Sequence, residues 1–248
     1  MTAAQGVKTA IVTGAAGGIG AALCVAFGQA GYRVIGCDCR DSASNCDVFL
    51  QFDLRTLSAS ASDRHVVLER IRAALGGDGV AALVNNAAVQ VLGSAEALTV
   101  DDWRETLDVN LLAPFLLTQA LLPEIERVGG SVVNVASVHA QLTKPGFVAY
   151  ATSKAALVGL TRSLAVELGS RVRVNAVLPA ATETPMLVAG LGPGQVDALG
   201  AMHPLGRIAS PEEVAAAVVY LASGAASFVN GAVLAVDGGI GGRLHDPD

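Results

Sequence analysis

A tyrosine stands four residues before a lysine at the head of an apolar, alanine-rich segment: Tyr150 and Lys154 in the stretch YATSK. On a helix, residues i and i+4 share one face, so this spacing places an ammonium close to a phenol. A nearby cation favours the phenolate and lowers the tyrosine pKa from its usual value of about 10. Such a phenol can exchange a proton near neutral pH. The pair is therefore a candidate general acid/base, although its spacing also fits an ordinary surface pair.

A glycine-rich stretch, TGAAGGIG at residues 13–20, follows a short apolar segment and opens a helix-like one. Gly14 permits a tight turn, while Gly18 and Gly20 let the backbone approach a pyrophosphate at the helix N-terminus. The spacing is GxxxGxG rather than the GxGxxG of many dinucleotide sites. The stretch predicts a dinucleotide site, with ordinary turn glycines as the alternative.

An acidic residue ends the second apolar segment, where the adenosine ribose of a dinucleotide would lie. Asp38 follows Gly20 by 18 residues. A carboxylate at this place accepts both ribose hydroxyls of NAD and repels the 2′-phosphate of NADP. Neither Ala15 nor Ala16 supplies a cation for that phosphate, and Arg40 is the only cation close to the acid. We therefore predict NAD as the coenzyme, with NADP as the less favoured alternative.

Short β-rich segments alternate with longer helical ones, and these elements must position the residues above. Strands are predicted at residues 8–13, 33–38, 48–54, 80–86, 130–137, 171–179 and 232–239. Helices are predicted at residues 19–31, 63–75, 101–125, 150–168 and 211–223. Repeated alternation of strand and helix implies a parallel sheet with helices on both faces. The predicted fold class is α/β: a single doubly wound Rossmann-type domain, residues 1–248, with a seven-stranded parallel sheet.

Composition and charge argue against several classes of protein. Hydrophobic residues make up 52% of the 248 residues and charged residues 15%, which argues against disorder. The net charge of −6 counts against nucleic acid as a partner. No apolar run reaches the length of a membrane span, and the N-terminus lacks signal-peptide features, so we expect a cytoplasmic protein without a membrane partner. The four cysteines lack a convincing ligand spacing, so no metal site is predicted.

Together these motifs resemble the short-chain dehydrogenase/reductase family, in its compact branch, over nearly the whole chain. The TGxxxGIG motif matches residues 13–20, the NNAG motif matches NNAA at residues 85–88, and the PGxxxT motif matches PAATET at residues 179–184. Both departures replace glycine with alanine, the smallest side chain, so we expect modest backbone change and retained binding. The family's catalytic asparagine, serine and YxxxK pair match Asn110, Ser137, Tyr150 and Lys154.

The resemblance implies a role for each catalytic candidate. Tyr150 would be the general acid/base, Lys154 would lower its pKa and hold the nicotinamide ribose, and Ser137 would donate to the substrate oxygen. The carbonyl of Asn110 would hold a water that links the lysine to solvent. Pro114 supports this role independently, because it has no N–H to donate to the Asn110 carbonyl. The helix is therefore expected to kink there and leave that carbonyl free.

The resemblance also implies the coenzyme contacts. Asp53, at the end of the third predicted strand, would approach the adenine, and Thr184 would hold the carboxamide. Asn85 is expected to tie neighbouring strands together. The full set predicted to bind NAD is Gly14, Gly18, Ile19, Gly20, Asp38, Asp53, Leu54, Asn86, Ala87, Tyr150, Lys154, Pro179, Thr182 and Thr184.

The substrate is expected to lie beneath a mobile lid at residues 185–210, which are glycine-rich and partly apolar. Gln90 and His139 resemble the pair with which the family's 3-hydroxybutyrate dehydrogenases hold a carboxylate. The lysine that those enzymes place three residues before the tyrosine is Phe147 here, and Lys144 is displaced. A small hydroxy acid is therefore not predicted. The candidate substrate contacts are Gln90, Ser137, His139, Phe147 and Leu187.

The predicted activity is that of an NAD-dependent short-chain alcohol dehydrogenase or ketone reductase, which transfers a hydride between NAD(H) and a secondary alcohol or ketone. One alternative is an NADPH-dependent ketone reductase of the 3-oxoacyl or polyketide type, against which Asp38 argues. Another is a non-catalytic cofactor-binding protein, against which the intact catalytic set argues. The apolar helices at residues 101–125 and 150–168, with the resemblance, predict a homotetramer.

Overall fold

Seven strands form one sheet at the centre of the computed structural model, which describes residues 7–41, 45–192 and 194–244. The strand order is β3-β2-β1-β4-β5-β6-β7, and every neighbouring pair is parallel. The strands are β1 (Lys8–Thr13), β2 (Tyr32–Asp38), β3 (Val48–Gln51), β4 (Val80–Asn85), β5 (Ser131–Val135), β6 (Arg173–Pro179) and β7 (Val233–Val236). The predicted fold class is confirmed. The strand order reverses between β1 and β4, where ligands bind in such sheets.

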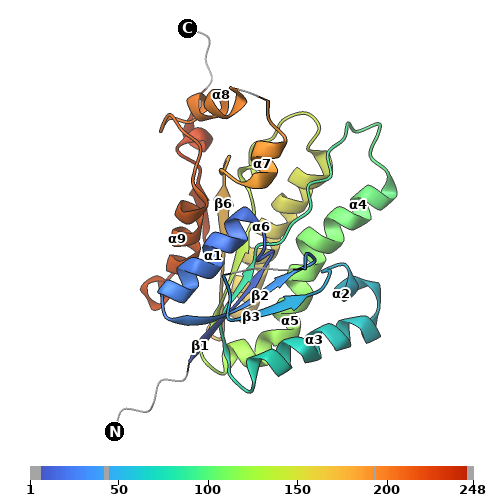
Figure 1. Ribbon diagram of the computed structural model, residues 1–248, viewed down its shortest axis with the longest axis vertical. Coiled ribbons are helices and arrows are strands. Elements are labelled where there is room, and N and C mark those ends of the chain that lie inside the picture. The colour runs from blue at the N-terminus through green and yellow to red at the C-terminus, as the bar shows by residue number, and fades with distance from the viewer. Residues whose placement is uncertain (1–6, 42–44, 193, 245–248) are drawn as a thin grey trace.

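Helices cover both faces of the sheet, so its central strands are apolar on both sides. In β1, Ile11 packs into one core cluster, while Ala10 and Val12 pack into the other. Helices α1 and α9 lie against the second cluster, and α3, α5 and α6 lie against the first (Figure 1). The helices are α1 (Gly18–Gln29), α2 (Thr56–Ala59), α3 (Ala61–Leu75), α4 (Val100–Leu107), α5 (Ala113–Glu126), α6 (Val148–Leu168), α7 (Pro185–Ala189), α8 (Gln195–Met202) and α9 (Pro211–Ala222).

Strands β3 and β5 end earlier than predicted because polar turns follow them. β3 ends at Gln51, and the Asp53 carboxylate accepts a hydrogen bond from the Arg55 N–H in a turn that leads into α2, which was not predicted. β5 ends at Val135, and Ser137 then caps a single 3-10 turn over residues Val138–Ala140. Both turns therefore place polar side chains at the carboxyl edge of the sheet.

The long helix predicted at residues 101–125 is interrupted in its middle. α4 ends at Leu107, a π-helical turn covers Asp108–Leu112, and α5 follows. Within that turn the Ala113 N–H bonds to the Asp108 carbonyl, five residues back. Pro114, in the first turn of α5, has no N–H to donate, which explains why the regular ladder breaks at this point. The interruption therefore falls where the kink was predicted.

The same helix is long and apolar enough, by length and composition, to cross a membrane when Val100–Glu126 is taken as one piece. Its apolar side is used inside the fold instead. Val109, Ala113, Leu117 and Leu121 belong to the buried cluster beneath the sheet. It is therefore a core helix.

The predicted lid is built from α7 and α8, which lie together at the upper end of Figure 1, beyond the carboxyl end of β6. A single parallel bridge between Thr182 and Ala209 joins the two ends of this segment at its base. Arg243 also donates to the Met202 carbonyl at the end of α8. The segment is thus tied down at its base and at the end of α8, residue 193 lies outside the described residues, and its role as a mobile lid stays a prediction.

Candidate active site

The glycine-rich loop presents an uncapped helix N-terminus at the switch point of the sheet. Gly17 is the N-cap of α1, so no side chain caps the helix, and its first turn carries no acidic residue. The first N–H groups of a helix lack intrahelical acceptors and carry partial positive charge. This end of α1 therefore fits an anion such as a pyrophosphate.

The glycines of this loop are required by close backbone contacts. A Cβ on Gly20 would lie 1.9 Å from the Gly14 carbonyl oxygen, and Gly14 itself has a φ of +68°. A Cβ on Gly18 would lie 2.7 Å from Cγ2 of Thr184. Thr184, predicted to hold the carboxamide, therefore lies directly against the loop. Ile19, also a predicted coenzyme contact, is partly buried and packs on the core cluster that lies against α1 and α9.

A threonine that sequence reasoning did not single out ties the loop to the NNAA segment. Oγ1 of Thr13 accepts hydrogen bonds from the backbone N–H groups of Asn86 and Ala87 at 3.0 and 3.1 Å. The Asn86 side chain donates in turn to the Thr13 and Gly14 carbonyls. Thr13 is the first residue of the TGxxxGIG motif, so the sequence did contain a signal for its role. These bonds keep Asn86 and Ala87 beside the loop although alanine replaces the motif's glycine.

Asn85 occupies the structural position that was predicted for it. Its amide donates to Oδ1 of Asn134 on the neighbouring strand β5 at 2.8 Å. Asn134 donates onward to Oγ1 of Thr161 on α6 at 2.9 Å. The chain of bonds links β4, β5 and α6 beneath the site.

Asp38 lies at the end of β2 with its carboxylate already occupied by hydrogen bonds. It accepts from the backbone N–H groups of Ala16 and Arg40 at 3.0 Å each, and from Nε and Nη2 of Arg40 at 3.2 Å each. Burial raises the pKa of Asp38, but the bonds from Arg40 and Ala16 outweigh this and hold it below its usual range. The carboxylate is therefore charged and paired, which the sequence alone did not reveal.

The other predicted coenzyme contacts have local partners of their own. Asp53 pairs with Arg55, whose hydrogen bonds lower its pKa, and Leu54 is buried in the core beneath the sheet. Pro179 ends β6, and the Thr182 hydroxyl donates to the Ala180 carbonyl. Contact of any of them with a coenzyme stays a prediction.

Ser137 and Tyr150 are brought together from two different elements. Ser137 follows β5 and caps the 3-10 turn, where its Oγ accepts from the His139 N–H at 3.2 Å. Tyr150 lies in the first turn of α6. Burial raises the pKa of Tyr150, and a hydrogen bond from the Ser137 hydroxyl lowers it only in part. The side chains of Ser137 and Tyr150 therefore lie close enough to interact.

Lys154 is buried and turned toward the sheet. Its Nζ donates to the Val135 carbonyl at 2.8 Å and lies 5.8 Å from the centre of the Tyr150 ring. Burial lowers the pKa of Lys154 to about 8. Burial is the largest influence on the pKa of Tyr150, and the Lys154 ammonium is directed at a carbonyl, so the lowering of the tyrosine pKa by this lysine stays a prediction. The i, i+4 spacing thus predicted correctly that the two side chains lie near each other.

Asn110 is fully buried, and its side chain links two other segments of the chain by hydrogen bonds. It exchanges two hydrogen bonds with the backbone of Val89, and its amide donates to Oγ of Ser153 at 3.0 Å. Ser153 donates in turn to the Tyr150 carbonyl at 2.7 Å. Ser153 was missed, although its place inside YxxxK, directly before Lys154, was a signal. This chain joins the π turn to the helix that carries the tyrosine.

Some of the candidate substrate contacts lie beside Tyr150, whereas others lie on separate segments of the chain. The rings of His139 and Phe147 stack beside Tyr150. The segment that carries Gln90 is tied to theirs, since the Gly93 N–H donates to the Gly146 carbonyl, but the Gln90 side chain is exposed. Leu187 is half-buried on α7.

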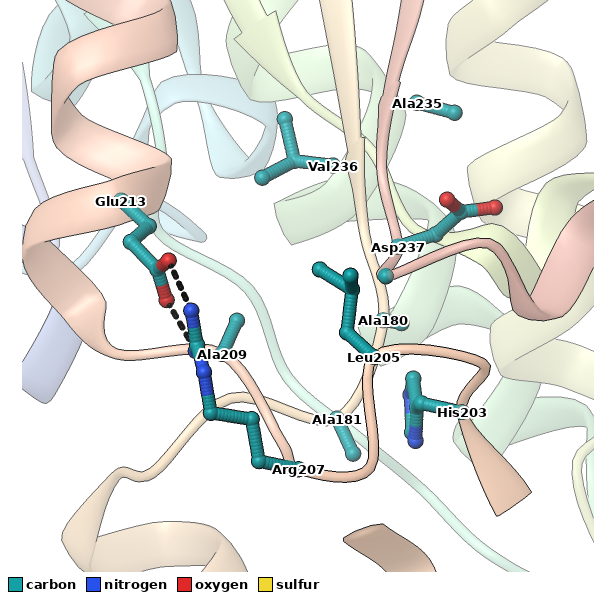
Figure 2. Close-up of a pocket in the computed structure, with 11 residues that line it drawn as sticks. Ala180, Ala181, His203, Leu205, Arg207, Ala209, Glu213, Ala235, Val236 and Asp237 are labelled. Atoms are coloured by element: carbon teal, nitrogen blue, oxygen red, sulfur yellow. Dashed lines mark hydrogen bonds and ion pairs between the residues drawn. The ribbon is translucent and has the colours of Figure 1, made fainter. Parts of the chain in front are cut away.

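A separate cavity of about 230 Å³ lies at the edge of the sheet, between the ends of β6 and β7 and the start of α9. Figure 2 shows Arg207 and Glu213 paired at one side of it and His203 at the other. None of the catalytic candidates lines this cavity. Within the described part of the chain, no three His, Cys, Asp or Glu side chains could together hold a metal ion.

The strand order, the uncapped glycine-rich loop at the switch point, and Ser137 bonded to Tyr150 beside a buried lysine define an NAD(P)-dependent oxidoreductase of alcohols and ketones. A family model described as enoyl-(acyl carrier protein) reductase matches residues 14–241. D-threitol dehydrogenase of Mycolicibacterium smegmatis is 40% identical in an alignment of 242 positions that covers 94% of this chain and 92% of that protein.

Two solved structures share the whole architecture. Ligand-free aldohexose dehydrogenase of Thermoplasma acidophilum matches with a TM-score of 0.88 and 34% identity over 98% of each chain. The 3-ketoacyl-(acyl-carrier-protein) reductase of Brucella melitensis, complexed with NADH, matches with a TM-score of 0.83 and 28% identity over 94% of this chain and 98% of that one. The chain belongs to the short-chain dehydrogenase/reductase family.

Proposed function

We propose that this protein transfers a hydride reversibly between NAD(H) and a secondary alcohol or ketone. The observation that carries the proposal is that the fold brings Ser137, which follows β5, together with Tyr150 and Lys154 of α6, with the Lys154 ammonium buried and bonded to the Val135 carbonyl. When bound, the nicotinamide supplies the hydride donor or acceptor and, in its oxidised form, a positive charge. The glycine-rich loop, Asp38 and Thr184 are the residues of this chain that would hold the dinucleotide.

Tyr150 is the proton donor in ketone reduction and the acceptor in alcohol oxidation. Ser137 supports both directions, because its Oγ accepts from the His139 N–H and its own proton remains free to donate. That proton stabilises negative charge on the substrate oxygen. Lys154, with a pKa lowered to about 8 by burial, is suited to pass a proton near neutral pH.

Asp38 favours NAD over NADP in this proposal. It stays ionised beside the glycine-rich loop, where it would accept from ribose hydroxyls and repel a 2′-phosphate. The structural relative from Brucella melitensis that binds NADH is compatible with this assignment. That relative is also a 3-ketoacyl reductase, so an NADPH-linked ketone reductase remains the rival, with Arg40 as its phosphate contact.

The first experiment is a titration with NADH and with NADPH, followed by nicotinamide fluorescence, on the wild type and on Tyr150→Phe. We expect NADH to bind at least about tenfold more tightly than NADPH, since the 2′-phosphate would meet a carboxylate. Tyr150→Phe should keep NADH binding and lose turnover of every secondary alcohol by a factor of about 100 or more. Turnover retained in Tyr150→Phe would contradict the assignment of the tyrosine. Equal or tighter NADPH binding would contradict the NAD assignment.

We further propose that the single domain works as a cytoplasmic homotetramer. Apolar side chains on α6, α9 and the following turn face outward, among them Val166 at 84% exposed and Phe228 at 103%. Such apolar surface is typical of subunit contacts. Light scattering should give about four times the chain mass of 25.0 kDa, and a single chain mass would contradict the tetramer.

A further inference from the structure

Ser153 lies on α6 in the turn that carries Tyr150, directly before Lys154, and its side chain is fully buried. Its Oγ donates a hydrogen bond to the Tyr150 carbonyl at 2.7 Å and accepts one from Nδ2 of Asn110 at 3.0 Å. A serine that bonds back to a carbonyl of its own helix is common. The bond from Asn110, which belongs to a different element, is what distinguishes Ser153.

The hydrogen-bonding groups of Asn110 determine the direction of every bond in this chain. Its Oδ1 accepts from the Val89 N–H at 2.9 Å, so a backbone donor orients the amide. One Nδ2 proton goes to the Val89 carbonyl at 2.9 Å, and the other goes to Ser153. Because the hydroxyl proton of Ser153 goes to the Tyr150 carbonyl, its oxygen is left to accept from Asn110. The chain of bonds therefore has one arrangement.

The same chain reaches the glycine-rich loop through the segment that follows β4. Oγ1 of Thr13 accepts from the Ala87 N–H at 3.1 Å. Val89, two residues further on, is held by the side chain of Asn110. The segment that is predicted to line the coenzyme is therefore fixed at one end to the dinucleotide loop and at the other, through Ser153, to α6.

The proposed reaction needs two transfers at the two ends of one carbon–oxygen bond. The hydride is exchanged at the carbon, and Tyr150 exchanges the proton at the oxygen. A misplacement of about 1 Å between reacting groups can cost about 100-fold in rate. The bonds through Ser153 join the segment predicted to line the coenzyme to the helix that carries the tyrosine. Their loss would therefore change the position of one relative to the other.

We propose that Ser153 is a positioning residue, which holds Tyr150 at the distance from the coenzyme segment that the combined hydride and proton transfer requires. The inference rests on the proposed function. Because its side chain has no exposed surface, Ser153 acts through the Tyr150 backbone and the Asn110 side chain and exchanges no proton with the substrate. Its hydroxyl therefore contributes to the chemical step and not to the affinity for the coenzyme.

The same helix offers a closely matched control about two turns further along. Thr161 is also fully buried, donates to the Leu157 carbonyl of its own helix at 2.8 Å, and accepts from the side-chain amide of Asn134 at 2.9 Å. Thr161→Val and Ser153→Ala therefore remove the same two kinds of hydrogen bond, and each leaves a buried amide N–H without its acceptor. Of the two hydroxyls, that of Ser153 is bonded to Tyr150 and that of Thr161 is not.

The test measures the single-turnover rate of NADH formation from NAD and an accepted secondary alcohol, which separates the chemical step from coenzyme release. Ser153→Ala should lower this rate about 10- to 100-fold while it changes KM and NADH affinity by less than about threefold. Thr161→Val should lose a similar amount of melting temperature but keep the rate within about threefold of the wild type. Ser153→Cys, whose thiol donates and accepts only weakly, should have a rate between those of Ser153→Ala and the wild type.

An unchanged rate in Ser153→Ala would overturn the proposal. An equal fall in Ser153→Ala and Thr161→Val would also overturn it, because the two hydroxyls would then share a purely structural role, as would a loss of NADH affinity as large as the loss of rate. If Ser153→Ala does not fold, an unchanged rate in Ser153→Cys overturns the proposal. If the wild type binds NADH but oxidises no secondary alcohol, the proposed function itself fails. That failure is distinguishable because it is measured on the wild type alone.

Discussion

Arg40 holds the carboxylate of Asp38 with one edge of its guanidinium, since Nε donates to one oxygen and Nη2 to the other at 3.2 Å each. The arginine side chain is 57% exposed and the aspartate 5%. An ion pair with one partner this exposed to solvent contributes only about 0.2–1 kcal/mol to stability. Ribose hydroxyls can therefore displace Arg40 at small cost, and a 2′-phosphate could use it. We therefore expect the arginine to weaken the selectivity for NAD that we propose for the aspartate.

Removal of Arg40 should sharpen coenzyme selectivity. In Arg40→Ala the carboxylate is free for the ribose hydroxyls and unshielded toward a phosphate, so the preference for NADH over NADPH should rise about three- to tenfold. Fluorescence titration with both coenzymes measures this. Arg104→Ala, which removes an exposed arginine paired with Asp101 on α4, is the control. A lower preference in Arg40→Ala would show that Arg40 favours NADH.

Ser137→Ala should lower kcat more than it raises KM. The variant removes the hydroxyl that donates toward Tyr150 and the substrate oxygen, and loss of one such donor typically costs about 100-fold or more in kcat. Steady-state kinetics with any accepted secondary alcohol gives the split. Ser163→Ala, at an exposed position on α6, is the matched control. An unchanged kcat would exclude Ser137 from the chemical step.

Because of Lys154, the free energy of unfolding should rise with pH between about pH 8 and pH 10.5. Its pKa in the folded protein is about 8, below the reference value of 10.5, so between these values the unfolded chain binds more protons than the native one. Stability relative to Lys154→Met should therefore increase by about 2 kcal/mol from pH 6.5 to pH 9.5, with most of the gain above pH 8.

Urea unfolding of both proteins at the two pH values checks this, and Lys8→Met, at an exposed position on β1, controls for the loss of an ammonium. A difference between wild type and Lys154→Met that is constant with pH would show that the lysine is not held in a desolvated place.

Two glycines of α1 should respond oppositely to alanine. A Cβ on Gly20 would overlap the Gly14 carbonyl, so Gly20→Ala should destabilise the protein and abolish coenzyme binding. A Cβ on Gly28 would meet no atom within 4 Å, so Gly28→Ala should stabilise by about 0.5–1 kcal/mol. Thermal unfolding with and without NADH compares them. If Gly20→Ala and Gly28→Ala had the same melting temperature and the same shift with NADH, the close packing of the loop would be contradicted.

Although α2, α7 and α8 were not predicted, the order of the seven strands and the longer helices, the glycine-rich loop and the break at Pro114 were all predictable from the sequence. Each depends on spacing within a few residues: alternation of apolar segments, glycines at the start of a helix, and a proline without an N–H. The catalytic candidates could also be named, because their motifs are short and ordered along the chain. Local chemistry is sufficient for these features because the interacting atoms belong to neighbouring residues.

The directions of the side chains were decided by the tertiary structure. Lys154 turns to the Val135 carbonyl, and the ring of His139 meets that of Phe147 eight residues further on. Arg40 closes on Asp38 rather than standing free. The directions of these side chains depend on burial and on which acceptors the fold brings within reach. Spacing along the chain does not contain that information. Burial, which raises the pKa of Tyr150, is likewise a product of the packed core and not of spacing along the chain.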